Sequence, residues 1–183
     1  MSDNVRLPSL STFPRLLMHH AQMRPNHPAT REKDMGIWQT WTWSQVAEEV
    51  RAMACGLAEL GFKRGDNLAI IGDNRPRLYW AMCAAQCLGG VPVPLYQDAV
   101  AAEMVFVLQD AGIKFAIVED QEQVDKLLEN KSQCPDLLHI LYDDPRGLRH
   151  YNQSFLHGLD EVQEMGRIHS RNHPEVLDGE SEQ

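Results

Sequence analysis

The stretch DNLAIIGDNRPRLYWAMCAAQCLGGVPVPLY, residues 66–96, decides the fold of this chain. It holds two short apolar runs, NLAIIG from Asn67 and VPVPLY from Val91, separated by an alanine-rich segment with helical periodicity. A strand, a helix and a strand in this order form a βαβ unit, in which the two strands lie parallel in one sheet. Both runs are almost continuously apolar, which is typical of strands that are buried on both faces.

The same pattern continues toward the C-terminus. Further apolar runs are FAIVED from Phe115 and LLHILY from Leu137, with helical spacing before and between them. We expect a helix that Asp98 caps and Gly112 ends, followed by a weaker helix over residues 121–130. The sequence therefore predicts an α/β fold with an open, mainly parallel sheet and helices on both faces.

The flanking segments complete the predicted domain. Thr42 and Gln45 have the spacing of a capping box and begin a helix that runs to Gly61. A helix over residues 12–23 and a β-hairpin over 29–43 precede it, and one more helix is expected over 154–165.

We expect the domain to span residues 1–165, with its core at 42–142. Residues 166–183 are expected to be a disordered linker toward further sequence, because the final stretch HSRNHPEVLDGESEQ has almost no apolar content.

Composition excludes several classes of function. The chain has 183 residues with 17 Lys and Arg against 26 Asp and Glu, a net charge of −9, and no basic run, which argues against nucleic-acid binding. The most apolar window, residues 81–96, is interrupted by Gln86, two glycines and two prolines, so no transmembrane segment is expected. Four cysteines are too few for a disulfide scaffold and suit a reducing cytoplasm.

No motif in the chain carries a reaction alone. There is no GxxxxGK[ST] loop and no GxGxxG after a strand. Gly72-Asp73-Asn74 follows the first core strand, where ligands bind in parallel sheets, but it lacks the further glycines that wrap a phosphate. We therefore expect a turn in which Asp73 or Asn74 caps the next helix, and we expect no metal site, since Cys83 and Cys87 have no second cluster of ligands.

The stretch from Trp41 to Asp120 resembles the N-terminal part of the AMP-forming acyl-CoA synthetases, the adenylate-forming superfamily. The resemblance rests on the order of TWTWSQVAEEV, GFKRGDNLAIIGDN and GGVPVPLY. The later piece DAVAAEMVFVLQDAGIKFAIVED is more similar to bacterial long-chain fatty acid–CoA ligases than to other branches.

The resemblance implies a ligase that works in two steps. A fatty carboxylate attacks the α-phosphate of MgATP to give an acyl-adenylate and pyrophosphate, and the thiol of coenzyme A then displaces AMP. The family's lysine-containing phosphate loop, its adenine and ribose contacts and its C-terminal lysine do not occur in these residues. The resemblance therefore predicts an N-terminal fragment of a larger enzyme, with no catalytic residue, no bound cofactor and no activity by itself.

Two residues are candidates for the acyl and coenzyme A channels of that family. Asn74 and Tyr96 follow the first two core strands, although a helix cap and a packed aromatic are the ordinary roles at such positions. A fragment should also expose an apolar docking face, which could support a homodimer, and the four tryptophans (Trp38, Trp41, Trp43 and Trp80) are candidates for part of it.

Two questions stay open at this point. The first is whether the chain is instead a stand-alone flavodoxin-like module that binds a small ligand or a protein without catalysis. The second is whether the whole protein, expected in the cytoplasm, also binds the membrane periphery, for which the sequence shows no basic amphipathic helix.

Overall fold

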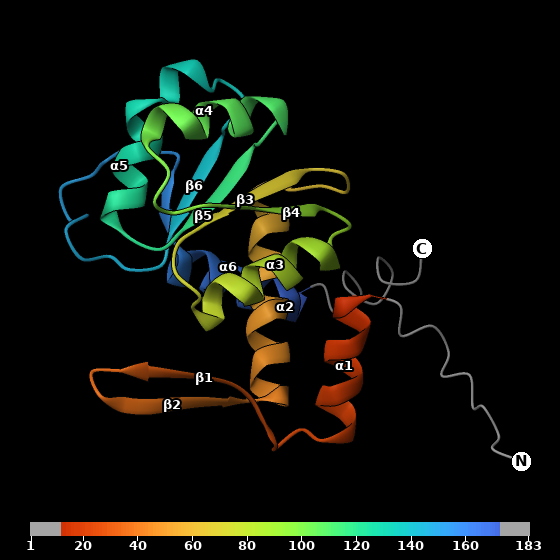
Figure 1. The fold of residues 1–183 in the computed structure, drawn as a ribbon. Coiled ribbons are helices and arrows are strands. Elements are labelled where there is room, and N and C mark those ends of the chain that lie inside the picture. Colours follow the sequence, from red (N-terminus) through yellow and green to blue (C-terminus); the bar gives the residue numbers. More distant parts are fainter. Residues whose placement is uncertain (1–11, 173–183) are drawn as a thin grey trace, which may run out of the picture.

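The structure, a computed structural model, describes residues 12–172 and contains one five-stranded sheet and one hairpin (Figure 1). All pairings in the larger sheet are parallel, in the order β4-β3-β5-β6-β7. Its strands are β3 (Asn67–Ile71), β4 (Val91–Leu95), β5 (Phe115–Val118), β6 (His139–Tyr142) and β7 (Leu156–Gly158). The helices are α1 (Phe13–Met23), α2 (Trp43–Glu59), α3 (Pro76–Cys87), α4 (Ala101–Asp110), α5 (Gln121–Glu129) and α6 (Leu159–Asn172), with a short 3₁₀ turn η1 (Lys131–Gln133).

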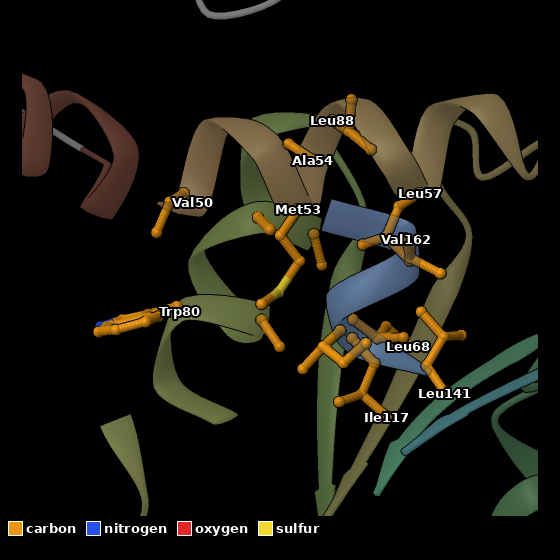
Figure 2. Packing of buried hydrophobic residues seen from close by; sticks show 14 of the residues in the cluster. Val50, Met53, Ala54, Leu57, Leu68, Trp80, Leu88, Ile117, Leu141 and Val162 are labelled. Atoms are coloured by element: carbon orange, nitrogen blue, oxygen red, sulfur yellow. The ribbon is translucent and has the colours of Figure 1, made fainter. Parts of the chain in front are cut away.

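Alternate side chains of the strands point to opposite faces, and helices cover both. Leu68, Ile70 and Ile117 pack with buried residues of α2, α3 and α6 in one core (Figure 2). Ala69 and Ile71 pack with α4 and α5 in a second core on the other face. The predicted α/β class and the parallel sheet are confirmed.

Helices α2 and α6 cross with their backbones close together. A Cβ atom at Gly166 would lie 1.9 Å from the Ala52 carbonyl oxygen, and one at Gly56 would lie 2.2 Å from the Val162 carbonyl oxygen. Only glycine fits at either position without a shift of the backbone.

The hairpin consists of β1 (Pro28–Asp34) and β2 (Ile37–Thr42), which pair antiparallel around Met35 and Gly36, both with positive φ. It is confirmed close to its predicted bounds. Its base packs on the domain through Trp41, whose ring meets the ring of Trp80 edge-on at 5.3 Å. Trp80 is buried and Trp41 and Trp43 are half-buried, so Trp38 is the exposed member of the four tryptophans.

The C-terminal part differs from the prediction. Residues 154–165 were expected to form a helix and residues 166–183 a disordered linker, whereas the structure has strand β7 and then α6, which continues to Asn172. The helix is ordered because Val162 and Gly166 are buried against α2, although its sequence is largely polar. The core thus extends beyond residue 142, and residues 173–183 lie outside the described part.

Two helix starts also differ from the prediction. Asp98 does not cap α4, whose N-cap is Val100, and α3 is preceded by Arg75 rather than capped by Asp73 or Asn74. Pro76 is the cause at α3, because the residue before a proline is held extended; Arg75 has φ −98° and ψ 145°.

The edge strand β4 cannot easily accept another strand. The Val91 N–H donates to the Asp66 carbonyl oxygen (3.0 Å), and the parallel ladder then directs alternate residues of β4 toward β3. Pro92 and Pro94 fall on the outward alternation and have no N–H, so this edge lacks those donors.

Candidate functional site at the carboxyl edge of the sheet

The carboxyl ends of β3 and β4 bound a cleft of about 290 Å³. Its walls come from the loop after β3, the first turns of α3 and the loop after β4. Both residues singled out from the sequence, Asn74 and Tyr96, line this cleft. The structure therefore brings them together, because parallel strands end at the same edge.

Polar contacts fix the loops on either side of the cleft. The Tyr79 hydroxyl donates to Asn74 Oδ1 at 3.0 Å, and Gln97 Nε2 donates to Asp73 Oδ1 at 2.5 Å. Among the described residues the NH₂ group of Asn74 has no partner. Tyr96 is 75% exposed, so it is not the packed aromatic that its position allowed.

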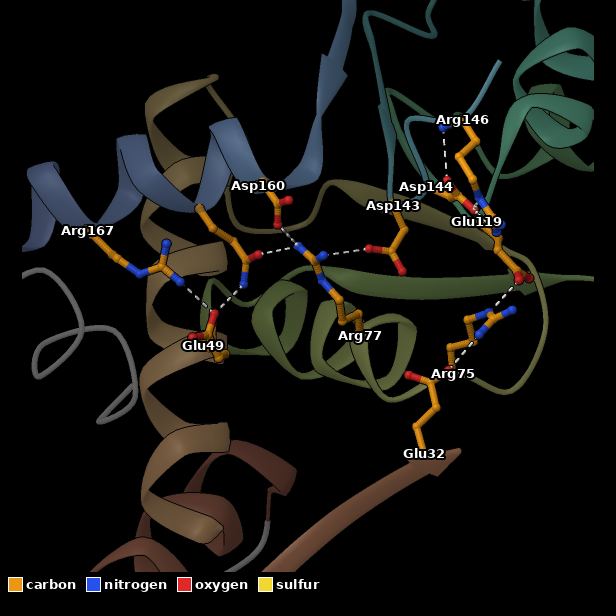
Figure 3. Close-up of polar contacts among 11 residues, drawn as sticks. Glu32, Glu49, Arg75, Arg77, Glu119, Asp143, Asp144, Arg146, Asp160 and Arg167 are labelled. Carbon is orange, nitrogen blue, oxygen red and sulfur yellow. Dashed lines mark hydrogen bonds and ion pairs between the residues drawn. The ribbon is translucent and has the colours of Figure 1, made fainter. Parts of the chain in front are cut away.

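Glu119, directly after β5, organises the edge and was not singled out from the sequence. Its buried carboxylate accepts a hydrogen bond from the Asp73 N–H at 2.6 Å and forms an ion pair with Arg75 Nε. Arg75 Nη1 in turn lies 2.7 Å from Glu32 Oε1 on the hairpin. Figure 3 shows this chain of contacts. A side chain at Gly72 would collide with Glu119, since its Cβ would lie 2.6 Å from the Glu119 Cβ.

A second network joins this edge to α2 and α6 (Figure 3). Arg77 of α3 lies 2.8 Å from Asp143 Oδ1 and 2.6 Å from Asp160 Oδ1, and it donates to Gln163. Gln163 and Arg167 in turn both donate to Glu49 of α2. Burial raises the pKa of Asp143 despite the opposing effect of Arg77.

These groups do not fit a nucleotide triphosphate or its magnesium ion. The Asp73 N–H, a backbone donor of the loop, is already bound by Glu119, and the carboxylates of Asp73 and Asp98 line the cleft. Like charges would repel phosphate there. Within residues 12–172 no group of His, Cys, Asp and Glu side chains is arranged to hold a metal.

The family follows from a comparison with family models. Residues 17–176 match the model described as AMP-binding enzyme. The chain belongs to the AMP-binding enzyme family. The match covers the whole sheet, the hairpin and the helices from α2 to α6, together with α1 from Leu17 onward.

Curated relatives of this AMP-binding family chain include CoA ligases. It is 32% identical over 119 residues to long-chain-fatty-acid–CoA ligase ACSBG2 of Mus musculus, covering 64% of this chain and 18% of that one. It is 27% identical over 128 residues to long-chain-fatty-acid–CoA ligase FadD15 of Mycobacterium bovis, covering 69% and 21%. An uncharacterized protein of Mycobacterium tuberculosis is 37% identical over 107 residues, covering 58% and 59%. The chain thus spans less than two thirds of the length of each.

Solved structures show the same fold. The anthranilate CoA ligase AuaEII, in complex with anthranoyl-AMP, has a TM-score of 0.73 at 18% identity over 83% of this chain and 27% of its own. The A-PCP didomain of a carboxylic acid reductase from Segniliparus rugosus has a TM-score of 0.71 at 20% identity, covering 84% and 26%. At these identities the likeness shows the α/β fold alone. Among residues 12–172, no helix is long and apolar enough to cross a membrane.

Proposed function

We propose that this chain is the N-terminal α/β part of an acyl-CoA ligase that activates long-chain fatty acids. The observation that carries the proposal is the family match over residues 17–176, and long-chain ligases among the relatives support the substrate class. The reaction joins a fatty carboxylate to AMP with release of pyrophosphate, and coenzyme A then displaces AMP.

In this proposal the carboxyl-edge cleft forms one wall of the acyl or coenzyme A channel. The NH₂ group of Asn74 can donate a hydrogen bond to a carbonyl or carboxylate oxygen, and the exposed ring of Tyr96 offers an apolar surface. Asp73 and Asp98 make the same cleft unfavourable for phosphate. The cleft therefore suits the acyl or pantetheine part of a ligand and not the phosphates of ATP.

We further propose that ATP, Mg²⁺ and coenzyme A are used by the whole enzyme and that this chain alone is inactive. Its phosphate-binding motifs and catalytic lysine would come from sequence outside this chain. The four free cysteines suit the cytoplasm, and the exposed apolar side chains could support association with the rest of the enzyme or with a second copy.

The direct test is an activity assay of the isolated chain. The chain is incubated with MgATP, palmitate and coenzyme A, and AMP and palmitoyl-CoA are measured against a full-length ligase such as FadD15 as the positive control. We expect neither product from this chain. Turnover of ATP to AMP that depends on palmitate would contradict the assignment of the catalytic groups to other sequence.

The stand-alone binding module is separated from this proposal by complementation. A FadD15 variant that lacks the segment aligned with this chain is mixed with the chain in trans. Restored palmitoyl-CoA formation, weakened by Tyr96→Ala, supports the ligase. A ligand that binds this chain tightly with no gain of ligase activity in the mixture supports the module.

A further inference from the structure

Two of the four free cysteines lie one turn apart at the C-terminal end of α3. Cys83 and Cys87 have i,i+4 spacing in this helix, whose last residue is Cys87. Both are half-buried and pack against the core that α2, α3 and α6 form with the sheet. Residues four apart on a helix project from the same face, so the two thiols are neighbours. We call this pair the α3 dithiol.

The thiols of the pair are joined by a hydrogen bond. The Cys87 S–H donates to the sulfur of Cys83, which lowers the pKa of Cys83 and raises that of Cys87. The thiolate is the nucleophilic form of cysteine, so Cys83 is the thiol that reacts first. The other two cysteines are placed differently. Cys55 is 1% exposed on α2, and Cys134 is buried in the second core, on the opposite face of the sheet.

The α3 dithiol borders an apolar cavity. Cys83 lines a half-open cavity of about 590 Å³ between α1, α2 and α3, together with Leu16, Trp80 and Met82. Among the described residues that line this cavity, none is Asp, Glu, Lys or Arg. A reagent can reach Cys83 from solvent through the cavity, and an apolar group attached to that reagent would be removed from water there.

The spacing of the pair decides between two kinds of thiol chemistry. Cβ atoms four residues apart on a helix are separated by about 5–6 Å, whereas a disulfide requires about 3.5–4.5 Å. A direct S–S bond would therefore distort the last turn of α3. A bridge with one additional atom between the sulfurs spans the separation without that distortion. Two sulfurs are too few for the metal sites considered above, but a trivalent arsenic atom that carries one organic group takes two thiolates.

We propose that the α3 dithiol is a covalent binding site for a trivalent arsenical with one apolar organic group, R–As(OH)₂. Cys83 and Cys87 each replace one hydroxyl of the arsenical. Two As–O bonds break, two As–S bonds form, and each thiol proton leaves with a hydroxide as water, so no electron is transferred and no other reactant is needed. The R group then lies in the cavity beside Trp80 and Met82.

The chemistry of the two partners matches. Thiolates are soft ligands and favour soft acceptors, and two thiols held side by side by a helix bind such an acceptor without further ordering of the chain. The reaction needs neither ATP nor coenzyme A. The inference therefore does not depend on the proposed ligase activity.

The test is intact-protein mass spectrometry of the full chain after treatment with phenylarsine oxide, which hydrates to the arsenical described above. We expect one phenylarsenic group per chain, bound with loss of two thiol hydrogens. The adduct should survive millimolar glutathione, a monothiol, and should be removed by 2,3-dimercaptopropanol, a dithiol. Arsenite, which has no R group, should bind more weakly than phenylarsine oxide.

Four matched substitutions locate the site. Cys83→Ala and Cys87→Ala each leave one thiol of the pair, and alanine has the highest helix propensity. A second linked contact commonly strengthens binding by about 10²–10⁴-fold, so both variants should bind at least roughly a hundredfold more weakly and lose the glutathione-resistant adduct. Cys55→Ala and Cys134→Ala remove the other two thiols and should retain it. Circular dichroism verifies that all four variants are folded.

Three results would overturn the inference. One is an unchanged chain that holds no glutathione-resistant phenylarsenic group, or an adduct that Cys83→Ala or Cys87→Ala retains. Another is loss of the adduct in folded Cys55→Ala, or tighter binding of arsenite than of phenylarsine oxide, since either would indicate a site of three thiols. The third is ready formation of a Cys83–Cys87 disulfide with oxidised glutathione, detected by peptide mapping, which would contradict the argument from distance.

Discussion

At the scale of single residues, the crossing of α2 and α6 depends on glycine. Replacing Gly166 with alanine places a Cβ 1.9 Å from the Ala52 carbonyl oxygen, so the two backbones must separate. We expect the Gly166→Ala variant to lose about 1–3 kcal/mol in the free energy of unfolding, measured with urea. Ile168→Ala, at an exposed position of the same helix, is the control and should change stability much less.

Arg77 is the second residue on which the packing of several elements depends. Its side chain is 23% exposed and forms an ion pair with the half-buried carboxylate of Asp143. Arg77→Met should lower the free energy of unfolding by about 2–3 kcal/mol, because it leaves the Asp143 carboxyl without its ion-pair partner. Arg146 pairs with Asp144, and its own side chain is 81% exposed. Arg146→Met should therefore change the free energy of unfolding very little. Equal losses in the two variants would contradict this account.

The two site residues were predictable in place but not in their contacts. Asn74 and Tyr96 each follow a buried apolar run, and the parallel sheet alone then brings them to one edge. Glu119 was missed because its partner Arg75 is 44 positions away in the sequence, and no local pattern links them. The signal that could have drawn attention to it is a carboxylate directly after a fully buried strand.

At the scale of elements, α2 has an N-terminus that local sequence determines. The Gln45 N–H donates to Thr42 Oγ1 at 3.4 Å, and the Thr42 N–H donates back to Gln45 Oε1 at 2.9 Å, which confirms the predicted capping box. Thr42→Ala should lower the free energy of unfolding by about 1 kcal/mol. Thr40→Ala in the exposed hairpin is the control, and a similar loss there would show that the cap contributes nothing specific.

The pairing of β6 with β7 should make stability depend on pH. His139 Nδ1 lies 3.0 Å from His157 Nε2, and burial lowers the pKa of both rings; the charge of His157 lowers that of His139 further. Because both pKa values are lowered by folding, the unfolded chain binds more protons than the folded chain below about pH 6.5. The free energy of unfolding should therefore fall as the pH is lowered from about 7.5 to about 5.5. His157→Gln should flatten that dependence, and an unchanged slope would contradict it.

The elements that we predicted wrongly from the sequence are those with weak apolar patterns. Helices α2 and α5 and all strands up to β6 were predictable from their periodicity. Helix α6 is mostly polar, yet it is ordered by an extensive, close contact with α2 that includes Val162, Gly166 and Gln163. A count of apolar residues does not detect such a contact. Strand β7 has three residues, too few for a period to show.

At the scale of the whole molecule, two cavities of different lining lie on either side of α3. The carboxyl-edge cleft has a mixed lining that includes the carboxylates of Asp73 and Asp98, while the cavity between α1, α2 and α3 is lined almost wholly by apolar side chains. The side chains of Tyr79 and Met82 line both cavities.

We infer that this AMP-binding family chain forms a wall on the acyl side of the enzyme and has no nucleotide site of its own. The measurement that tests it most directly is isothermal titration of the chain with MgATP, with palmitate and coenzyme A titrated in parallel. We expect no saturable heat with MgATP, because the Glu119 carboxylate already accepts the Asp73 N–H and carboxylates line the cleft. Tight, saturable binding of MgATP would contradict the claim and would mean that these residues form a nucleotide site of their own.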